Sequence, residues 1–210
     1  MNDIRLTELL CSKLCHDLVG PVGAIGNGME LLAEEELGMS AEALELTALS
    51  TRRASAILQF YRIAYGLGQT ERRQDPNFLA ELAAGLLEGG RVSLDWPAEA
   101  KATVWPEGSG KLILNMISLA QEALPTGGTI RIGITESGAG AEISATAEGK
   151  GVGFGDATLE ALAEGASLQQ LTPRNVHAFF TMVLSQRIGR RIEISPPEGD
   201  RLRLSAQIPN

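Results

Sequence analysis

The stretch CSKLCHDLVGPVGAIGNGMELL, residues 11–32, decides the predicted fold of this chain. Apolar residues recur along it and its flanks every three or four positions, which predicts one long amphipathic helix. A second pattern of this kind covers residues 41–66, after the short connection LGMS. Because a connection this short makes two helices antiparallel neighbours, residues 1–72 are predicted to form a helical hairpin.

The predicted hairpin has more apolar surface than a single seam between two helices can bury. The apolar residues beside the main stripes are Leu9, Val19, Leu31, Leu46, Leu49 and Ile63. A second copy of the chain would cover them in a dimeric four-helix bundle with twofold symmetry. The C-terminal part of the same chain could cover them instead. We favour the dimer, because bundles of this length usually bury both flanks.

The pattern changes over residues 73–210, which we expect to form a second domain. Predicted helices cover residues 76–87, 107–124, 156–164 and 173–188. Segments that alternate between apolar and polar residues predict strands, namely RVSLDW (91–96), KATVW (101–105), TIRIGIT (129–135), AEISATA (141–147), RIEIS (191–195) and RLRLSAQI (201–208). Helices and a mainly antiparallel sheet in two layers make an α/β sandwich, so the predicted class is α+β.

Composition excludes several classes of protein. The net charge of −8 in 210 residues argues against nucleic acid as a main partner. The chain lacks the 18-residue apolar run of a transmembrane helix, and its first residues do not resemble a secretory signal. Its two cysteines, Cys11 and Cys15, cannot build a disulfide framework, which suits the cytoplasm. We expect them to be buried small side chains rather than zinc ligands, because His16 points about 100° away from Cys15.

Any chemistry that needs an imidazole has two candidates, His16 and His177. His16 is followed by Asp17, and Pro21 lies inside the same helical pattern. The residues that share the helix face of His16 are Ser12, Gly20, Gly23 and Asn27.

This face contains two glycines, which cost about 1 kcal/mol each relative to alanine in a helix. A helix that must admit another protein's backbone close to an imidazole has a reason to accept that cost. The alternative is that the glycines pack against another helix and that His16 is a buried histidine. We favour the functional interpretation, because the histidine, aspartate, proline and glycines occur together.

His-Asp-Leu-x-x-Pro at residues 16–21 resembles the H-box of sensor histidine kinases, and the following domain resembles their ATP-binding domain. The resemblance implies that His16 carries a phosphoryl group. It also implies that Asp17 orients or deprotonates the imidazole, which is chemically sound because a neutral imidazole is the nucleophile.

The residues with which those kinases bind ATP are missing here. Their Mg²⁺-binding helix carries two asparagines four residues apart, and the matching positions are Asn115 and Leu119. Leucine cannot bind a hard cation. Ala147 replaces the aspartate that binds adenine, and residues 172–183 lack the glycines of a phosphate-covering loop. We therefore expect no ATP binding, no cofactor and no bound metal.

This combination resembles the ChpT-type histidine phosphotransferases of alphaproteobacterial relays, whose opening signature is similar to residues 11–32. The resemblance implies a homodimer that takes a phosphoryl group from the receiver domain of a hybrid histidine kinase. It then passes the group to receiver domains of response regulators, and the receiver supplies Mg²⁺. Arg52 and Arg53 either contact an acidic receiver or form a solvated face. His177 is expected to be structural or solvent-facing.

Two other functions stay open. One is an ATP-dependent histidine kinase core with an atypical nucleotide site, which the missing nucleotide residues disfavour. The other is a dimeric scaffold that binds receivers without transferring phosphate. The pair of His16 and Asp17 disfavours the scaffold, because a scaffold needs no imidazole.

Overall fold

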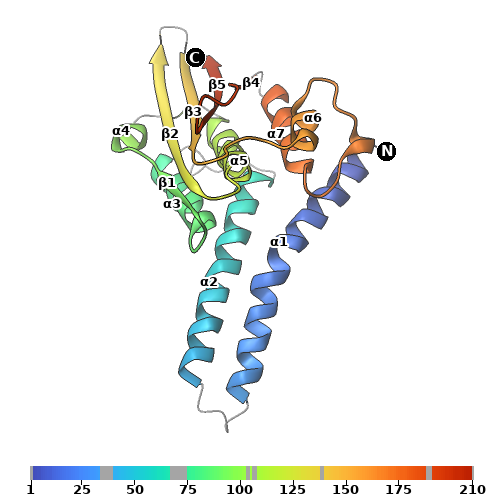
Figure 1. Cartoon of the computed structure of the whole chain (residues 1–210), viewed down its shortest axis with the longest axis vertical. Helices are drawn as coiled ribbons and strands as arrows, with labels where there is room; N and C mark the ends of the chain where they lie inside the picture. Colours follow the sequence, from blue (N-terminus) through green and yellow to red (C-terminus); the bar gives the residue numbers. More distant parts are fainter. Residues whose placement is uncertain are drawn as a thin grey trace.

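Two long helices, α1 (Asn2–Ala33) and α2 (Ser40–Ala64), form an antiparallel hairpin whose far half projects from the rest of the molecule (Figure 1). The computed structural model describes residues 2–33, 40–66, 75–102, 105, 108–137, 140–187 and 191–209. Helix α1 continues through Pro21. At Gly28 the helices are in such close contact that a Cβ atom would overlap the Thr47 side chain. The predicted hairpin is confirmed, and none of the described helices is long and apolar enough to cross a membrane.

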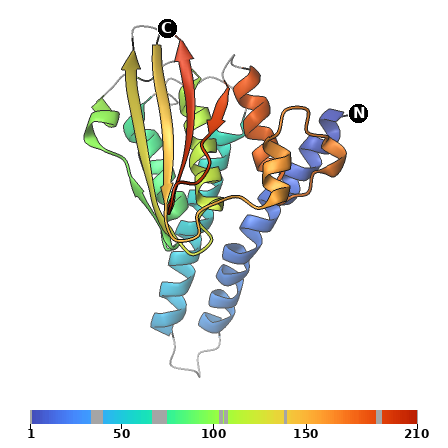
Figure 2. The ribbon, with the colours of Figure 1, turned by 45° about the horizontal axis from the view of Figure 1, so that its top comes forward.

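A five-stranded sheet forms the outer layer of the C-terminal part (Figure 2). The order is β1-β2-β3-β5-β4, and only β1 and β2 run parallel. The strands are β1 (Val92–Asp95), β2 (Gly128–Ser137), β3 (Gly140–Glu148), β4 (Ile192–Ile194) and β5 (Arg201–Pro209). This mainly antiparallel sheet with helices beside it confirms the predicted α+β class.

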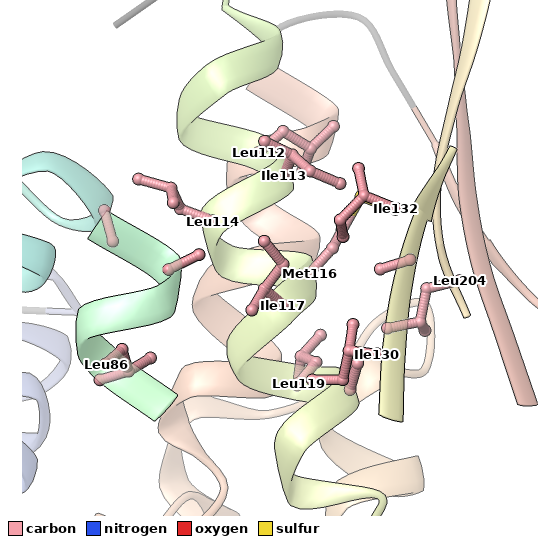
Figure 3. Packing of buried hydrophobic residues seen from close by; sticks show 14 of the residues in the cluster. Leu86, Leu112, Ile113, Leu114, Met116, Ile117, Leu119, Ile130, Ile132 and Leu204 are labelled. Carbon is pink, nitrogen blue, oxygen red and sulfur yellow. The ribbon is translucent and has the colours of Figure 1, made fainter. Parts of the chain in front are cut away.

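The central helix α5 (Ser109–Glu122) lies between the sheet and the other helices. Figure 3 shows Met116 and Ile117 of α5 between Leu86 on one side and Ile132 on the other. The remaining helices are α3 (Pro76–Leu87), α4 (Ala98–Ala102), α6 (Asp156–Leu162), the 3-10 helix η3 (Leu168–Gln170) and α7 (Val176–Arg187). The last residue of α5, Glu122, reaches the side of α1.

The predicted strand at residues 101–105 is wrong. Lys101 and Ala102 end helix α4, and Trp105 is buried, with its indole N–H donating to the carbonyl of Ala100 at 2.7 Å. The apolar alternation of KATVW therefore arises from a helix end and a buried tryptophan rather than from a strand. Residues 103 and 104 lie outside the described residues.

The C-terminal part of the chain covers one part of the hairpin and leaves another part exposed. Near its C-terminal end, α2 buries Ile57, Phe60 and Ile63 in one continuous core with α3 and α5. Ile63, which we expected a second copy to cover, is thus covered within the chain. Large apolar side chains keep 40 to 70 % of their surface exposed elsewhere on the hairpin: Val19, Val22, Met29, Leu44, Leu46, Leu49 and Leu58. The predicted boundary between residues 72 and 73 lies outside the described residues.

Hydrogen bonds at two places connect the hairpin to the C-terminal part of the chain. Arg5 of α1 donates to the carbonyls of Leu168, Gln169 and Leu171 in and after η3, at 2.8, 3.2 and 3.3 Å. Lys111 at the start of α5 donates to the carbonyls of Tyr65 and Gly66, at 3.3 and 3.0 Å. These contacts hold the N-terminal end of α1 and the C-terminal end of α2 against the C-terminal part of the chain (Figure 1).

Candidate functional site: an oriented histidine on the helical hairpin

His16 lies on α1 with 85 % of its side chain exposed. Its Nδ1 atom is 3.2 Å from Oδ1 of Asp17. Burial works against ionisation of Asp17, but the hydrogen bond from Tyr61 and the charge of Lys13 outweigh it and lower the pKa of that carboxyl. An ionised carboxylate only accepts hydrogen bonds, so the proton of this bond belongs to Nδ1. The lone pair of His16 is therefore on Nε2.

Both oxygens of Asp17 are occupied. Oδ1 accepts from His16, and Oδ2 accepts from the Tyr61 hydroxyl and lies 3.3 Å from Nζ of Lys13. Lys13 stands one helical turn before Asp17 on α1, whereas Tyr61 comes from α2. A carboxylate with these partners fits the task of orienting the imidazole better than that of taking up its proton.

The C-terminal domain reaches this site through Glu122. Its Oε1 atom is 3.9 Å from Nζ of Lys13. Burial raises the pKa of the Glu122 carboxyl to about 7, and the charge of Asp17 adds to the rise while Lys13 opposes it. Lys13 thus lies between two carboxyl groups, one on its own helix and one on α5.

A second network behind the first contains the other histidine. The Tyr61 and Tyr65 rings are stacked at 4.9 Å, and the Tyr65 hydroxyl lies 2.7 Å from Nδ1 of His177. Nε2 of His177 is 3.1 Å from the carbonyl of Asn115, which can only accept, so His177 carries its proton on Nε2. Burial, with help from Lys13, lowers the pKa of His177 to about 3. His177 is structural, as one of our two expectations had it, and the other expectation, a solvent-facing side chain, is wrong.

The face of α1 around His16 is open. A Cβ atom built at Gly20 or Gly23 meets nothing within 4 Å, so these glycines do not pack against another described helix of the same chain. Ser12 and Asn27 are exposed on the same face. A hollow of about 330 Å³ lies beside it, lined by residues that include Gly20, Pro21, Leu49 and Arg52. The docking role of this face stays a prediction.

The adjacent arginines Arg52 and Arg53 of α2 differ in their contacts. Both line that hollow, and Arg52 is exposed. Arg53 donates from Nη1 to the carbonyls of Gly85, Leu86 and Glu88 at the C-terminal end of α3. Arg53 therefore holds α3 against the hairpin, a role that its sequence context did not indicate.

Core packing occupies the positions that match the kinase nucleotide residues. Asn115 is fully buried, and its amide nitrogen donates to the carbonyls of Ala64 and Lys111, at 2.9 and 2.8 Å. Leu119 is fully buried in the core, and Ala147 of β3 pairs with Leu202 in the middle of the sheet. The loss of ATP binding stays a prediction that this packing supports.

Comparison with known proteins identifies the family of this chain. Residues 77–200 match the family described as "Histidine phosphotransferase C-terminal domain". The chain belongs to the histidine phosphotransferase family. It is 32 % identical over 195 residues to the protein phosphotransferase ChpT of Brucella abortus (strain 2308), covering 92 % of this chain and 91 % of that protein. A solved structure titled "1.7 Angstrom Structure of a Bacterial Phosphotransferase" superposes with a TM-score of 0.77 at 29 % identity, over 97 % of this chain and 96 % of that one.

The histidine phosphotransferase family predicted from residues 11–32 and from the altered nucleotide positions is thereby confirmed. The protein is a transferase of phosphorelays. The expectation of buried cysteines is wrong for the single chain, because Cys11 and Cys15 are exposed on α1. Within the described residues, no group of three or more His, Cys, Asp and Glu side chains is placed to hold a metal ion.

Sequence analysis missed three members of the candidate site, Lys13, Tyr61 and Glu122. Lys13 could have been found, since it stands four residues before Asp17 on a predicted helix. Tyr61 was visible only as part of the apolar stripe of the second helix, although it is one of two tyrosines in the chain. Nothing in the sequence around Glu122 indicates that it reaches α1.

Proposed function

We propose that this histidine phosphotransferase carries the phosphoryl group on Nε2 of His16 and exchanges it with aspartates of receiver domains. The observation that carries the proposal is the pairing of Asp17 with Nδ1 of His16, which leaves the Nε2 lone pair on an exposed side chain. The open surface at Gly20 and Gly23 supports it, because a receiver's backbone can approach the ring there.

In the proposed step, the Nε2 lone pair attacks the phosphorus of a receiver aspartyl phosphate. The P–N bond forms as the P–O bond to the aspartate breaks, and the aspartate leaves as a carboxylate. The imidazole becomes positively charged, and the ionised Asp17 stabilises that charge through Nδ1–H. The reverse step loads a second receiver. Because positioning and electrostatics dominate phosphoryl transfer, the chain needs geometry more than further reactive groups.

The proposal includes no autokinase activity. The amide nitrogen of Asn115 holds α2 and its amide oxygen is buried, while Leu119 and Ala147 are core residues, so none of the three offers an accessible ligand to ATP or Mg²⁺. We propose that Mg²⁺ comes to the reaction with the receiver domain.

The proposed state is a homodimer in the cytoplasm. The exposed apolar side chains of the hairpin come from both helices, with Val19 and Val22 on α1 and Leu46 and Leu49 on α2. A four-helix bundle formed with a second copy would bury them. The free, exposed thiols of Cys11 and Cys15 suit the reducing conditions of the cytoplasm.

Labelling with ³²P tests the proposal. The protein is mixed with labelled ATP alone and with a receiver domain that carries labelled aspartyl phosphate. We expect acid-labile label from the receiver only, its loss in His16→Ala, and normal labelling of the control Ser195→Ala, an exposed residue just after β4. Labelling by ATP alone would indicate a kinase. Receiver binding without labelling, unchanged in His16→Ala, would indicate a scaffold.

A further inference from the structure

A buried tyrosine on α2 meets the acid partner of the exposed histidine on α1. The Tyr61 side chain is 6 % exposed, and its hydroxyl donates to Oδ2 of Asp17, the oxygen that faces away from His16. The two residues are 44 positions apart in the chain. The contact therefore depends on how the two helices of the hairpin are packed.

The Tyr61 ring is held on several sides. Tyr65 stacks on it at 4.9 Å with 12° between the planes, and the edge of Phe60 meets it at 5.8 Å and 76°. Tyr65 is held in turn by His177 and by the edge of Phe180 at 5.2 Å. A ring packed in this way has little rotational freedom, so its hydroxyl is a donor in a fixed place.

The other partner of the same oxygen is less directional. Lys13 is a point charge on a flexible stem, at 3.3 Å from Oδ2, and it is shared with Glu122. Lys13 can keep Asp17 ionised without fixing the orientation of the carboxylate. Of these two partners of Oδ2, Tyr61 is the one whose side chain is locked by packing.

We propose that Tyr61 is a positioning residue for phosphotransfer: it fixes the Asp17 carboxylate, which in turn holds the Nδ1–H tautomer of His16. The proposal rests on the proposed role of His16. Without the Tyr61 hydroxyl, Asp17 turns more freely and the imidazole spends less time with its lone pair on Nε2. We expect a roughly tenfold slower transfer, the effect of losing one hydrogen bond to a charged group.

The chain contains a matched control and an internal reference. Tyr65 belongs to the same ring stack, but its hydroxyl meets His177 instead of Asp17. The only two histidines of the sequence are in opposite tautomers, with Nδ1–H in His16 and Nε2–H in His177. In an untagged protein, ¹⁵N spectra of the imidazoles therefore report the His16 tautomer beside a reference signal.

The test compares Tyr61→Phe and Tyr65→Phe with the full chain, using imidazole ¹⁵N spectra at pH 8 and the rate of labelling by a phosphorylated receiver. We expect Tyr61→Phe to mix the His16 tautomers and to slow labelling about tenfold. Tyr65→Phe should change only the His177 signal. Thermal unfolding of both variants shows how much stability each loses.

Two results would overturn the proposal: an unchanged His16 tautomer in Tyr61→Phe, or equal slowing in both variants in proportion to lost stability. Lys13→Met gives a second check, because it should slow transfer without mixing the tautomers as much as Tyr61→Phe does. If the wild-type chain takes no label from any receiver, the proposed function fails. The spectra still decide whether Tyr61 holds the tautomer.

Discussion

Replacing Glu122 by glutamine should change how stability depends on pH. Burial, aided by Asp17 and opposed by Lys13, raises the pKa of this carboxyl from 4.5 to about 7. The folded chain therefore binds the proton of Glu122 more tightly than the unfolded chain does. The resulting stabilisation is complete below about pH 4.5 and is lost as the pH rises through 7. The difference corresponds to about 3 kcal/mol, at 1.36 kcal/mol per pKa unit.

Glutamine has a similar shape and does not ionise. Relative to the wild type, Glu122→Gln should gain stability steadily between pH 5 and pH 8, by up to about 3 kcal/mol. Urea unfolding at four pH values measures this, and the difference between the two proteins removes the titration of their shared groups. Glu8→Gln, on the exposed side of α1, is the control, and we expect its difference to stay flat. A flat difference for Glu122→Gln as well would refute the reasoning.

The glycine face, the hairpin surface and Arg53 each give a further prediction. Gly23→Ala should raise the free energy of unfolding by about 1 kcal/mol, because the added Cβ meets open space. Gly28→Ala should lower the free energy of unfolding, because the added Cβ overlaps the Thr47 side chain. Equal changes for the two variants in urea unfolding would contradict this. Val22→Asp should convert the proposed dimer into monomers in light scattering, because it places a charge on the exposed apolar surface. A dimeric mass that the substitution leaves unchanged would exclude that interface. Arg53→Met should lower the free energy of unfolding by about 1–3 kcal/mol, because carbonyls at the end of α3 lose their donor. A variant that unfolds at the same temperature as the wild type in a thermal scan would contradict this.

The sequence predicts the elements of this fold well where one period persists over many residues. The hairpin, the helix at residues 76–87 and the long strands at 129–135 and 201–208 are confirmed within a few residues. The prediction fails at residues 101–105, because five residues cannot distinguish a strand from a helix end followed by a buried tryptophan.

The sequence predicts one part of the candidate site and not the other. The sequence predicts the pairing of His16 with Asp17, because the two residues are neighbours on one helix. The contacts of Asp17 with Tyr61 and of Lys13 with Glu122 depend on the rotation and axial shift of α1 against α2 and α5. Periodicity sets which face of a helix is apolar, but it does not set that shift, so a tyrosine in an apolar stripe gives no sign of a carboxylate beside its hydroxyl.

The hydrogen bonds between the hairpin and the C-terminal part of the chain affect the direction in which phosphoryl groups are transferred. A self-phosphorylating enzyme must let its nucleotide-holding domain travel to the histidine and back. Here such travel would break the bonds of Arg5 to η3, of Lys111 to the end of α2 and of Asn115 to Ala64 together. A rigid carrier offers every receiver the same histidine in the same setting, so it has no internal state that favours loading over unloading. Under the proposed function, the abundance and phosphorylation of its partners would then decide the net flux, by mass action alone.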